Sequence, residues 1–234
     1  MGDANCEGVA ANLDGILKRI NHAAIRAGRD PDSVRLLVVS KTWPADKIAE
    51  VVNAGHTHFG ENKVQEAEGK VPVLPENLDW HLIGHLQRNK VRKALPIFDT
   101  IHSIDSLKLA RYTSNIATEL GIKPDVYLQV NIAAEESKNG YAISDLENEF
   151  EQLVELSGLN IIGLMCIPPA AESPDLVRPW FVKLRELRDE FQKKNNHPLP
   201  GLSMGMSGDF EIAIEEGATI VRVGSAVFGS RNYA

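Results

Sequence analysis

Short apolar segments alternate with helix-like segments eight times along this chain. The apolar segments are residues 34–41, 56–60, 79–84, 98–104, 125–132, 159–166, 202–207 and 219–226. Short, largely apolar segments of this length are expected for buried strands. Strands that alternate with helices indicate a parallel sheet, and eight such units are what a closed barrel needs. The sequence therefore predicts an α/β fold, a single (β/α)8 TIM barrel.

Helices are expected after each strand, and an extra N-terminal amphipathic helix is expected at residues 6–27, ahead of the first strand. The others are expected at 45–53, from 62 onward, 87–94, 106–120, 144–156, 174–194, in a short segment ending at 216, and at 227–230. No linker interrupts the alternation, so residues 1–234 are expected to form one domain. An open doubly wound sheet is the alternative, but the glycine-rich GxGxxG pattern that often follows its first strand is missing.

Composition narrows the classes of partner. The chain has 25 Lys and Arg against 32 Asp and Glu, a net charge of −7, which disfavours binding to nucleic acid or an anionic membrane. The basic segment at 87–93 is isolated and is expected to be a solvated helix face. No apolar run approaches the ~18 residues of a membrane span, and no signal-peptide pattern opens the chain. Cys6 and Cys166 form no metal or disulfide pattern. A soluble cytoplasmic protein is expected.

Lys41 ends the first apolar segment, VRLLVVSK. Parallel α/β sheets bind their ligands at the carboxyl ends of the strands. A partly desolvated amine at that place loses some of its preference for the charged form and becomes a nucleophile toward carbonyl groups. Taken alone, this segment favours a lysine that merely leads the chain into solvent, so the rest of the chain must decide.

Other polar residues follow the predicted strands and are expected to share the same barrel end. They are Glu61, Asn62, His81, Asn131, Ser207, Arg222, Gly224 and Ser225. His81 lies within an apolar run, where a histidine is more often a core residue than a catalyst. Asn62 and Asn131 are similarly ambiguous. The seven histidines show no metal-ligand spacing, so no metal site is predicted. Met204 and Met206 are expected to fill the barrel.

The loops after the seventh and eighth strands have the composition of a phosphate site. Gly205, Ser207 and Gly208 follow one strand, and Gly224 and Ser225 follow the next. Barrels often bind phosphate with these two loops, through free backbone amides and hydroxyl groups. The serines could instead be helix N-caps. Because both loops occur at the expected place in adjacent units, we favour phosphate binding.

Arg222 lies two residues before Gly224, so both should point into the barrel. A buried arginine requires a partner, which is either a carboxylate in the barrel core or a ligand. A reactive lysine, an inward arginine and a phosphate site together suit pyridoxal 5′-phosphate (PLP). In that interpretation Lys41 forms the Schiff base and Arg222 faces the ring nitrogen.

Seven motifs in order resemble the pyridoxal phosphate homeostasis proteins, a family similar to the barrel domain of alanine racemase without its second domain. They are VVSKTWP at 38–44, FGENKVQE at 59–66, WHLIGHLQRNK at 80–90, VNIAAEESKNG at 130–140, GLMCIPP at 163–169, LSMGMSGDF at 202–210 and VRVGSAVFG at 221–229. The resemblance covers nearly the whole chain.

The resemblance implies that Lys41 carries the cofactor, that Ser207, Gly224 and Ser225 hold its phosphate, and that Arg222 faces the pyridine nitrogen. It also implies that Asn62 and His81 border the ring. Lys63 departs from the family, which usually has tyrosine after GEN, and a second amine near the aldehyde is therefore expected to be available.

The family is thought to bind PLP and help control its supply without established turnover. The racemases of this fold use a second acid/base tyrosine from an additional domain, which is not expected in a chain that ends at Ala234. A monomeric cofactor carrier or buffer that serves apo PLP-dependent enzymes is therefore expected. A racemase of low activity is the alternative, and a sugar-phosphate aldolase-like barrel with a Schiff-base lysine is a third hypothesis.

Overall fold

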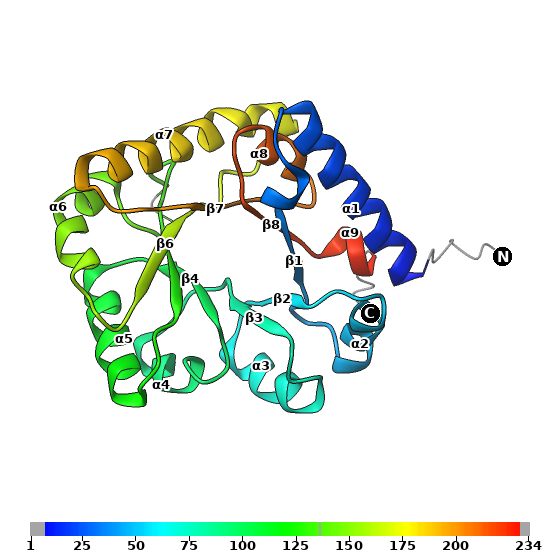
Figure 1. Ribbon diagram of the computed structural model, residues 1–234, viewed down its shortest axis with the longest axis horizontal. Helices are drawn as coiled ribbons and strands as arrows, with labels where there is room; N and C mark the ends of the chain where they lie inside the picture. Colours follow the sequence, from blue (N-terminus) through cyan, green and yellow to red (C-terminus); the bar gives the residue numbers. More distant parts are fainter. Residues whose placement is uncertain (1–7, 136, 230–234) are drawn as a thin grey trace.

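Eight parallel strands close into a barrel in the computed structural model, which describes residues 8–135 and 137–229 (Figure 1). The strands pair in sequence order, and β8 returns to pair with β1. They are β1 (Arg35–Val39), β2 (His58–Glu61), β3 (Asp79–Leu82), β4 (Thr100–Ile104), β5 (Asp125–Gln129), β6 (Asn160–Met165), β7 (Gly201–Met206) and β8 (Ile220–Val223). The predicted (β/α)8 barrel is confirmed, and the open sheet is wrong.

Helices surround the barrel on its outside. They are α1 (Val9–Arg26), α2 (Ala45–Asn53), α3 (Val64–Lys70), α4 (Val91–Ala94), α5 (Leu107–Leu120), α6 (Ile143–Val154), α7 (Arg178–Asn195), α8 (Phe210–Glu215) and α9 (Ser225–Phe228). Short 3-10 turns lie at Pro31–Ser33, Val71–Val73, Arg88–Lys90 and Pro174–Val177. The extra N-terminal helix is present as α1. The outer ends of the first and last expected helices, at residues 6 and 230, lie outside the described residues, as does Cys6.

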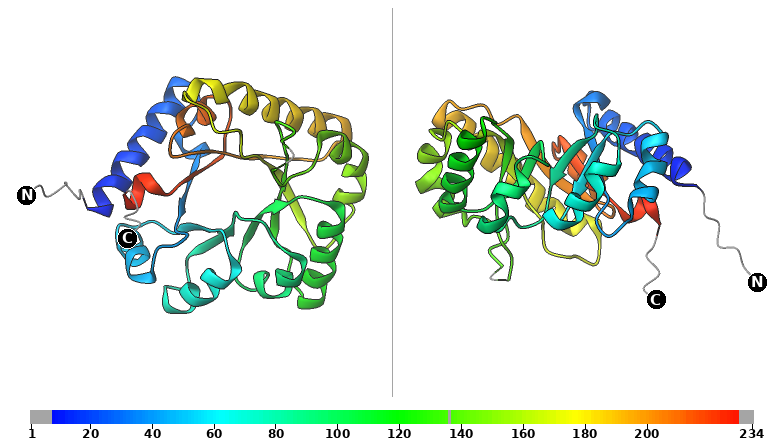
Figure 2. Two further views of the ribbon diagram at one scale, coloured as in Figure 1. Left: turned by 180° about the vertical axis from the view of Figure 1, so that it is seen from behind. Right: turned by 90° about the horizontal axis from the view of Figure 1, so that it is seen from below.

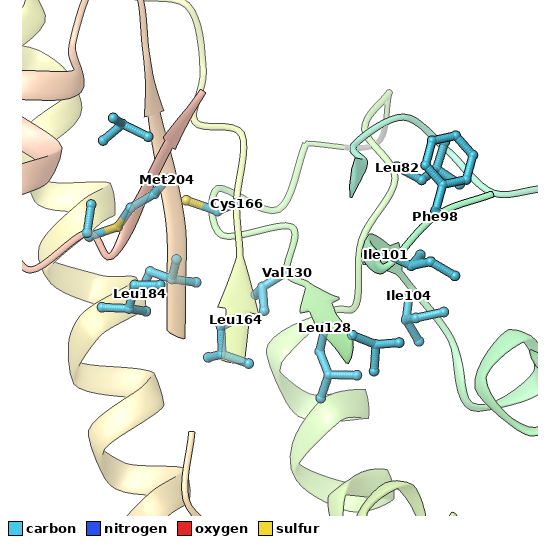
Figure 3. Packing of buried hydrophobic residues seen from close by; sticks show 14 of the residues in the cluster. Leu82, Phe98, Ile101, Ile104, Leu128, Val130, Leu164, Cys166, Leu184 and Met204 are labelled. Carbon is cyan, nitrogen blue, oxygen red and sulfur yellow. The ribbon is translucent and has the colours of Figure 1, made fainter. Parts of the chain in front are cut away.

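Strand alternation divides the apolar residues between two layers. On β8, Val221 and Val223 belong to the large core between barrel and helices, whereas Ile220 packs in a small cluster inside the barrel. Figure 3 shows the outer layer, where Leu164 of β6 and Leu184 of α7 lie among the buried side chains. The interior cluster comprises Leu37, Tyr127, Met165 and Ile220. Because this cluster is small, polar side chains occupy much of the remaining interior.

Local signals explain where α5 begins and ends. The Ser106 hydroxyl accepts a hydrogen bond from the Leu109 N–H at 3.3 Å, which caps the amino end. Gly121 adopts φ +68° at the carboxyl end, a left-handed conformation that glycine tolerates without steric cost. The expected boundaries at 106–120 therefore agree with the structure to within one residue.

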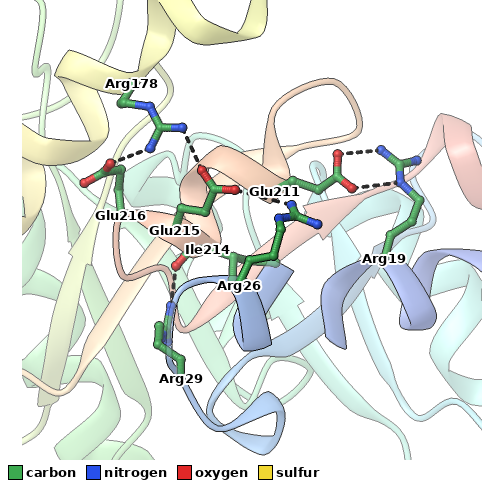
Figure 4. Close-up of polar contacts among 8 residues, drawn as sticks. All are labelled: Arg19, Arg26, Arg29, Arg178, Glu211, Ile214, Glu215 and Glu216. Atoms are coloured by element: carbon green, nitrogen blue, oxygen red, sulfur yellow. Dashed lines mark hydrogen bonds and ion pairs between the residues drawn. The ribbon is translucent and has the colours of Figure 1, made fainter. Parts of the chain in front are cut away.

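Arginine–glutamate pairs tie α8 to its two neighbouring helices (Figure 4). Arg19 of α1 contacts Glu211, and Arg178 of α7 contacts both Glu215 and Glu216 at 2.6 Å. Exposed pairs of this kind contribute only about 0–1 kcal/mol each. Their geometry nevertheless orients α8 from two sides, and α8 directly follows the loop that contains Ser207.

The loops that follow β5 and β6 project from the same side of the barrel (Figure 2). In parallel strands that follow one another, the carboxyl ends all meet at one face. This face is therefore where side chains from many strands can act together. No helix in the described part of the chain has the length and apolar composition needed to span a membrane.

Candidate functional site

A cavity of about 510 Å³ opens at the carboxyl ends of the strands. Its walls come from the loops after β1, β2, β3, β5, β6, β7 and β8. The lining residues are Val39, Lys41, Asn62, Ile83, Gly84, His85, Gln129, Asn139, Ile167, Met206, Ser207, Gly208, Arg222, Gly224 and Ser225. Six of the seven residues that the sequence assigns to the cofactor site therefore line one cavity, and the seventh, His81, does not.

Lys41 lies in a turn and not in the strand. β1 ends at Val39, two residues earlier than expected, and the Lys41 side chain is half-buried at the cavity wall. The next residue, Thr42, has φ +68°, a left-handed conformation that is uncommon for residues other than glycine. The strained turn directs the chain away from the barrel immediately after the lysine.

Residues of β2 and α3 hold this turn on both sides of Lys41. The Lys70 ammonium donates to the Ser40 carbonyl at 3.0 Å and to Glu61 Oε1 at 2.7 Å. The Ser40 hydroxyl donates to the same Glu61 oxygen at 2.7 Å. The Thr42 N–H donates to Glu66 Oε2 at 2.7 Å. Because the residues before and after the lysine are both bonded, the backbone that presents Lys41 is pre-organised.

Glu61 supports the turn and does not line the cavity, although its position at a strand end made it a site candidate. Its side chain is fully buried, and burial raises its pKa, while hydrogen bonds from Lys70 and Ser40 act in the opposite direction. Lys70 is itself only 9% exposed. Such a buried pair is costly to break, because the remaining charge would lack a partner.

The two predicted phosphate loops meet at the cavity. The Ser225 hydroxyl donates to the Ser207 hydroxyl oxygen at 3.2 Å, and both serines line the wall with Gly208 and Gly224. The helix-cap alternative is not observed, since the N-cap residues of α8 and α9 are Asp209 and Gly224. The hydroxyl groups are thus directed at each other and at the cavity.

Gly224 lets these loops approach the strand of the lysine. A Cβ atom at Gly224 would lie 2.9 Å from the Val39 carbonyl oxygen, closer than a side chain could be accommodated. Asp209 does not line the cavity, and its Oδ1 accepts from the Met206 N–H at 2.6 Å. The one carboxylate of this loop is therefore occupied by the loop's own backbone.

Arg222 is 4% exposed and reaches the floor of the cavity. Its Nη1 donates to Ser203 Oγ at 2.7 Å and its Nη2 donates to the Cys166 carbonyl at 2.9 Å. Burial lowers the pKa of the guanidinium. Among the described residues no carboxylate forms an ion pair with it, so the alternative of a barrel-core ion pair is wrong. Two of its five N–H groups are used, which leaves three for a ligand.

His81, Asn131 and Lys63 lie elsewhere. His81 is 1% exposed and its ring lies inside the barrel, bonded through Nδ1 to His102 Nε2 at 2.8 Å. Asn131 shapes its own loop, accepting from the Glu135 N–H at 3.1 Å. The Lys63 side chain is 71% exposed and its ammonium lies 3.9 Å from Glu66. It is not part of the cavity wall, so the structure does not place this second amine at the site.

Several lining residues were missed by the sequence analysis. They are Ile83, Gly84, His85, Gln129, Asn139, Ile167 and Met206. Ile83, Gly84 and His85 directly follow β3, and Gln129 is the last residue of β5, so the rule that strand ends meet at one face could have found them. Met206, expected inside the barrel, is 37% exposed at the cavity rim because β7 ends there.

Comparison with known proteins agrees with this geometry. The family profile of the alanine racemase N-terminal domain matches residues 12–232. The pyridoxal phosphate homeostasis protein of Aquifex aeolicus (strain VF5) is 48% identical over 222 residues, which cover 94% of this chain and 97% of that protein. The corresponding protein of Escherichia coli (strain K12) is 41% identical over 233 residues, covering 97% of this chain and 98% of that one.

Solved structures show the same similarity. The structure of PipY of Synechococcus elongatus PCC7942, determined with PLP bound, has a TM-score of 0.82 and 42% sequence identity. The match covers 95% of this chain and 100% of PipY. An alanine racemase of Clostridium difficile 630, at 16% identity, has a TM-score of 0.70 and matches 94% of this chain but 57% of its own length, a likeness of fold alone. The barrel and its cavity thus define a protein with the fold of the alanine racemase N-terminal domain. The chain belongs to the pyridoxal phosphate homeostasis protein family.

Proposed function

We propose that this protein binds PLP in the cavity and takes part in PLP homeostasis. The observation that supports this most directly is the convergence of an amine, a pair of hydroxyl groups and a buried guanidinium without a carboxylate partner on one cavity of about 510 Å³. These groups match the aldehyde, the phosphate and the ring nitrogen of PLP. The similarity to PipY, solved with PLP bound, supports the same assignment.

The residues divide into three roles. Lys41 provides the amine for covalent attachment, and the pre-organised turn around it directs that amine at the cavity. Ser207, Gly224 and Ser225 hold the phosphate through hydroxyl and backbone N–H groups. Arg222 donates to the ring nitrogen. Asn62 lies in the wall beside them, whereas His81 lies inside the barrel and does not line the cavity.

When bound, PLP would supply an aldehyde that reacts reversibly with amines. Its ring would accept electrons from the carbon that carries the amine. Arg222 donates hydrogen bonds and cannot readily give up a proton, so it leaves the ring nitrogen a weak electron acceptor. This arrangement favours storage and transfer over turnover. In the same proposal the protein acts in the cytoplasm as a monomer and supplies apo PLP-dependent enzymes.

Attachment to Lys41 is tested by loading the protein with PLP, reducing it with borohydride and mapping the labelled peptide. We expect a visible absorption band before reduction and the label on Lys41. Lys41→Ala should abolish both, and Lys63→Ala should change neither. A stable label found mainly on Lys63 or Lys138 would show that the assignment is wrong. Retention of PLP at wild-type strength by Lys41→Ala would have the same meaning.

The racemase alternative has one specific observation in its favour. His85 lines the cavity, and its Nδ1 lies 3.1 Å from Asp105 Oδ2, so a second group that could carry a proton is within the same wall. The imidazole is exposed, with 44% of the side chain accessible. We expect at most trace racemisation of common amino acids. Robust activity that is lost in both Lys41→Ala and His85→Gln would establish the alternative.

Transfer and oligomeric state need separate measurements. Loaded protein mixed with an apo PLP-dependent enzyme should restore that enzyme's activity faster than PLP dissociates freely into a trap. Sedimentation should show one chain per particle. A restoration rate equal to the rate of free dissociation would remove the carrier role while leaving PLP binding intact.

A further inference from the structure

A continuous series of buried polar side chains crosses the barrel interior beneath the cavity. It begins at Arg222 on β8 and passes through Ser203 on β7 and His102 on β4 to His81 on β3. The successive hydrogen-bond distances are 2.7 Å from Arg222 Nη1 to Ser203 Oγ, 2.8 Å from Ser203 Oγ to His102 Nδ1, and 2.8 Å from His102 Nε2 to His81 Nδ1. Beyond them, His81 Nε2 lies 3.2 Å from Oδ2 of the partly exposed Asp79, at an ion-pair distance but without hydrogen-bond geometry. Ser203 and His102 are completely buried.

The direction of these hydrogen bonds follows from Arg222, which can only donate. Ser203 Oγ accepts from Arg222, so its single proton is free for the other contact, and it donates to His102 Nδ1. Burial, followed by the charge of Arg222, holds the pKa of His102 well below its usual value. This imidazole is therefore neutral, with its proton on Nε2, and it donates to His81 Nδ1.

The series ends at a carboxylate on the opposite face of the barrel. Because His81 accepts at Nδ1, its proton lies on Nε2, the nitrogen nearer to Asp79. Burial alone would raise the pKa of Asp79, but the hydrogen bond from His58 and the neighbouring His81 outweigh it and hold the pKa well below its usual range. Asp79 Oδ2 lies 2.8 Å from His58 Nδ1. Asp79 is thus an anionic acceptor at the start of β3.

The far end of the relay also belongs to a group of possible metal ligands. His58, Asp79 and His81 bring one ligand atom each within 4.8 Å of one another, the one such group in the described part of the chain. A metal ion bound through His81 Nε2 would require the proton of that ring on Nδ1, the opposite of the tautomer inferred from Arg222. The tautomer of His81 therefore distinguishes the two arrangements.

We infer that Ser203, His102 and His81 form one directional hydrogen-bond relay, in ion-pair contact with Asp79 at its far end, that positions Arg222 without placing a carboxylate in the cavity. A carboxylate in direct contact with Arg222 would compete with the ligand for its N–H groups. The relay instead holds one side of the guanidinium and leaves three N–H groups for the cavity. This inference rests on the proposed function for the ligand, but the relay itself is a property of the protein.

The first test uses protein without PLP. Long-range proton–nitrogen correlation spectra of ¹⁵N-labelled protein report which ring nitrogen of each histidine carries the proton. We expect His81 and His102 both to be protonated on Nε2 and not on Nδ1. Ser203→Ala should shift the His102 Nδ1 resonance, and Ser203→Thr, which keeps the hydroxyl group, should restore it. A proton on Nδ1 of His102, or a His81 Nε2 without one, would overturn the relay.

The matched control is Ser103→Ala. Ser103 is also a completely buried strand serine, adjacent to His102, but its hydroxyl has no hydrogen-bond partner in the structure. Its removal should leave the histidine resonances in place. Equal shifts in Ser103→Ala and Ser203→Ala would indicate a general repacking effect and would count against the relay.

The second test uses protein loaded with ¹⁵N-labelled PLP. Ser203→Ala should weaken PLP retention by on the order of 10-fold, the effect of one hydrogen bond to a charged group, and should move the ring-nitrogen resonance. Asp79→Asn should move that resonance in the same direction by less, although Asp79 does not touch the cavity. If the ring-nitrogen resonance responds to Ser203→Ala and not to Asp79→Asn, Ser203 acts only through its own contact with Arg222 and the relay is wrong.

The two proposals fail in different ways. If the wild-type protein does not attach PLP, the proposed function is wrong. The histidine tautomers of the PLP-free protein then still test the relay. Normal attachment in the wild-type protein, with Ser203→Ala indistinguishable from Ser103→Ala, would remove the relay alone.

Discussion

The Thr42 N–H lies 2.7 Å from Glu66 Oε2, so a carboxylate of α3 holds the residue that follows Lys41. Burial would raise the pKa of Glu66, but the hydrogen bond from Thr42 and the charge of Lys70 outweigh it, and the pKa lies below its usual value. The carboxylate is therefore ionised at neutral pH. A left-handed turn at a residue other than glycine is maintained only when such contacts hold it.

Glu66→Gln should weaken PLP retention several-fold, because an uncharged amide oxygen is a weaker acceptor for the Thr42 N–H and no longer forms an ion pair with Lys70. The free energy of unfolding should fall by about 1 kcal/mol, as expected for one partly exposed hydrogen bond. Glu68→Gln is the matched control, since Glu68 lies on the same helix and contacts Lys93 at 3.2 Å, away from the turn. Similar PLP retention by the two variants would contradict a role for Glu66 in positioning Lys41.

Lys70→Met should destabilise the fold by about 3–5 kcal/mol, because it leaves the Glu61 carboxylate buried without its cation. Denaturation in urea measures this change. A double variant, Lys70→Met with Glu61→Leu, should recover most of the loss, since neither buried charge remains. If the double variant is as unstable as the sum of the two single variants, the buried pair is not the cause.

Ser207→Ala and Ser225→Ala should each weaken PLP retention by about 1.5–3 kcal/mol, the range for a hydrogen bond to a charged group. Their 3.2 Å contact predicts that the double variant loses less than the sum, because the two hydroxyl groups act on one site. Thermal unfolding of the PLP-free protein should change little, since neither serine caps a helix. If both variants bind PLP with unchanged affinity, the two serines do not hold the phosphate.

His56 should make the fold sensitive to mild acid. Burial, partly opposed by the hydrogen bond to the His58 carbonyl, lowers its pKa to about 4. The unfolded chain, with a pKa near 6.5, therefore binds more protons between about pH 4 and pH 6.5, and stability falls as the pH falls through this window.

His56→Gln should reduce the slope of unfolding free energy against pH there by up to about 1.4 kcal/mol per pH unit. His22→Gln, at an exposed histidine of α1, is the control for loss of an imidazole. The buried His102 contributes with the same sign in all three proteins, so the difference isolates His56. An identical slope in His56→Gln and wild type would show that His56 does not titrate in this way.

The periodicity of the sequence was enough to favour the barrel over the open sheet. Apolar runs between helical segments report which faces must be buried, and eight strand–helix units are the number that a closed barrel needs. The positions of Lys41, Ser207, Gly224, Ser225 and Arg222 followed from the same reasoning, because the carboxyl ends of parallel strands meet at one face. Their grouping around one cavity needed no knowledge of side-chain contacts.

Tertiary structure alone decided how these residues are held. The bonds from Glu66 and Lys70 to the Lys41 turn join residues 24 and 30 positions apart, and the bond from His102 to Ser203 joins residues 101 positions apart. No local pattern reports such pairs, since period and propensity describe one element at a time. His81 illustrates the difference: its strand was recognised, but its place within a series of buried polar groups depends on closure of the barrel, which brings β3, β4, β7 and β8 around a common interior.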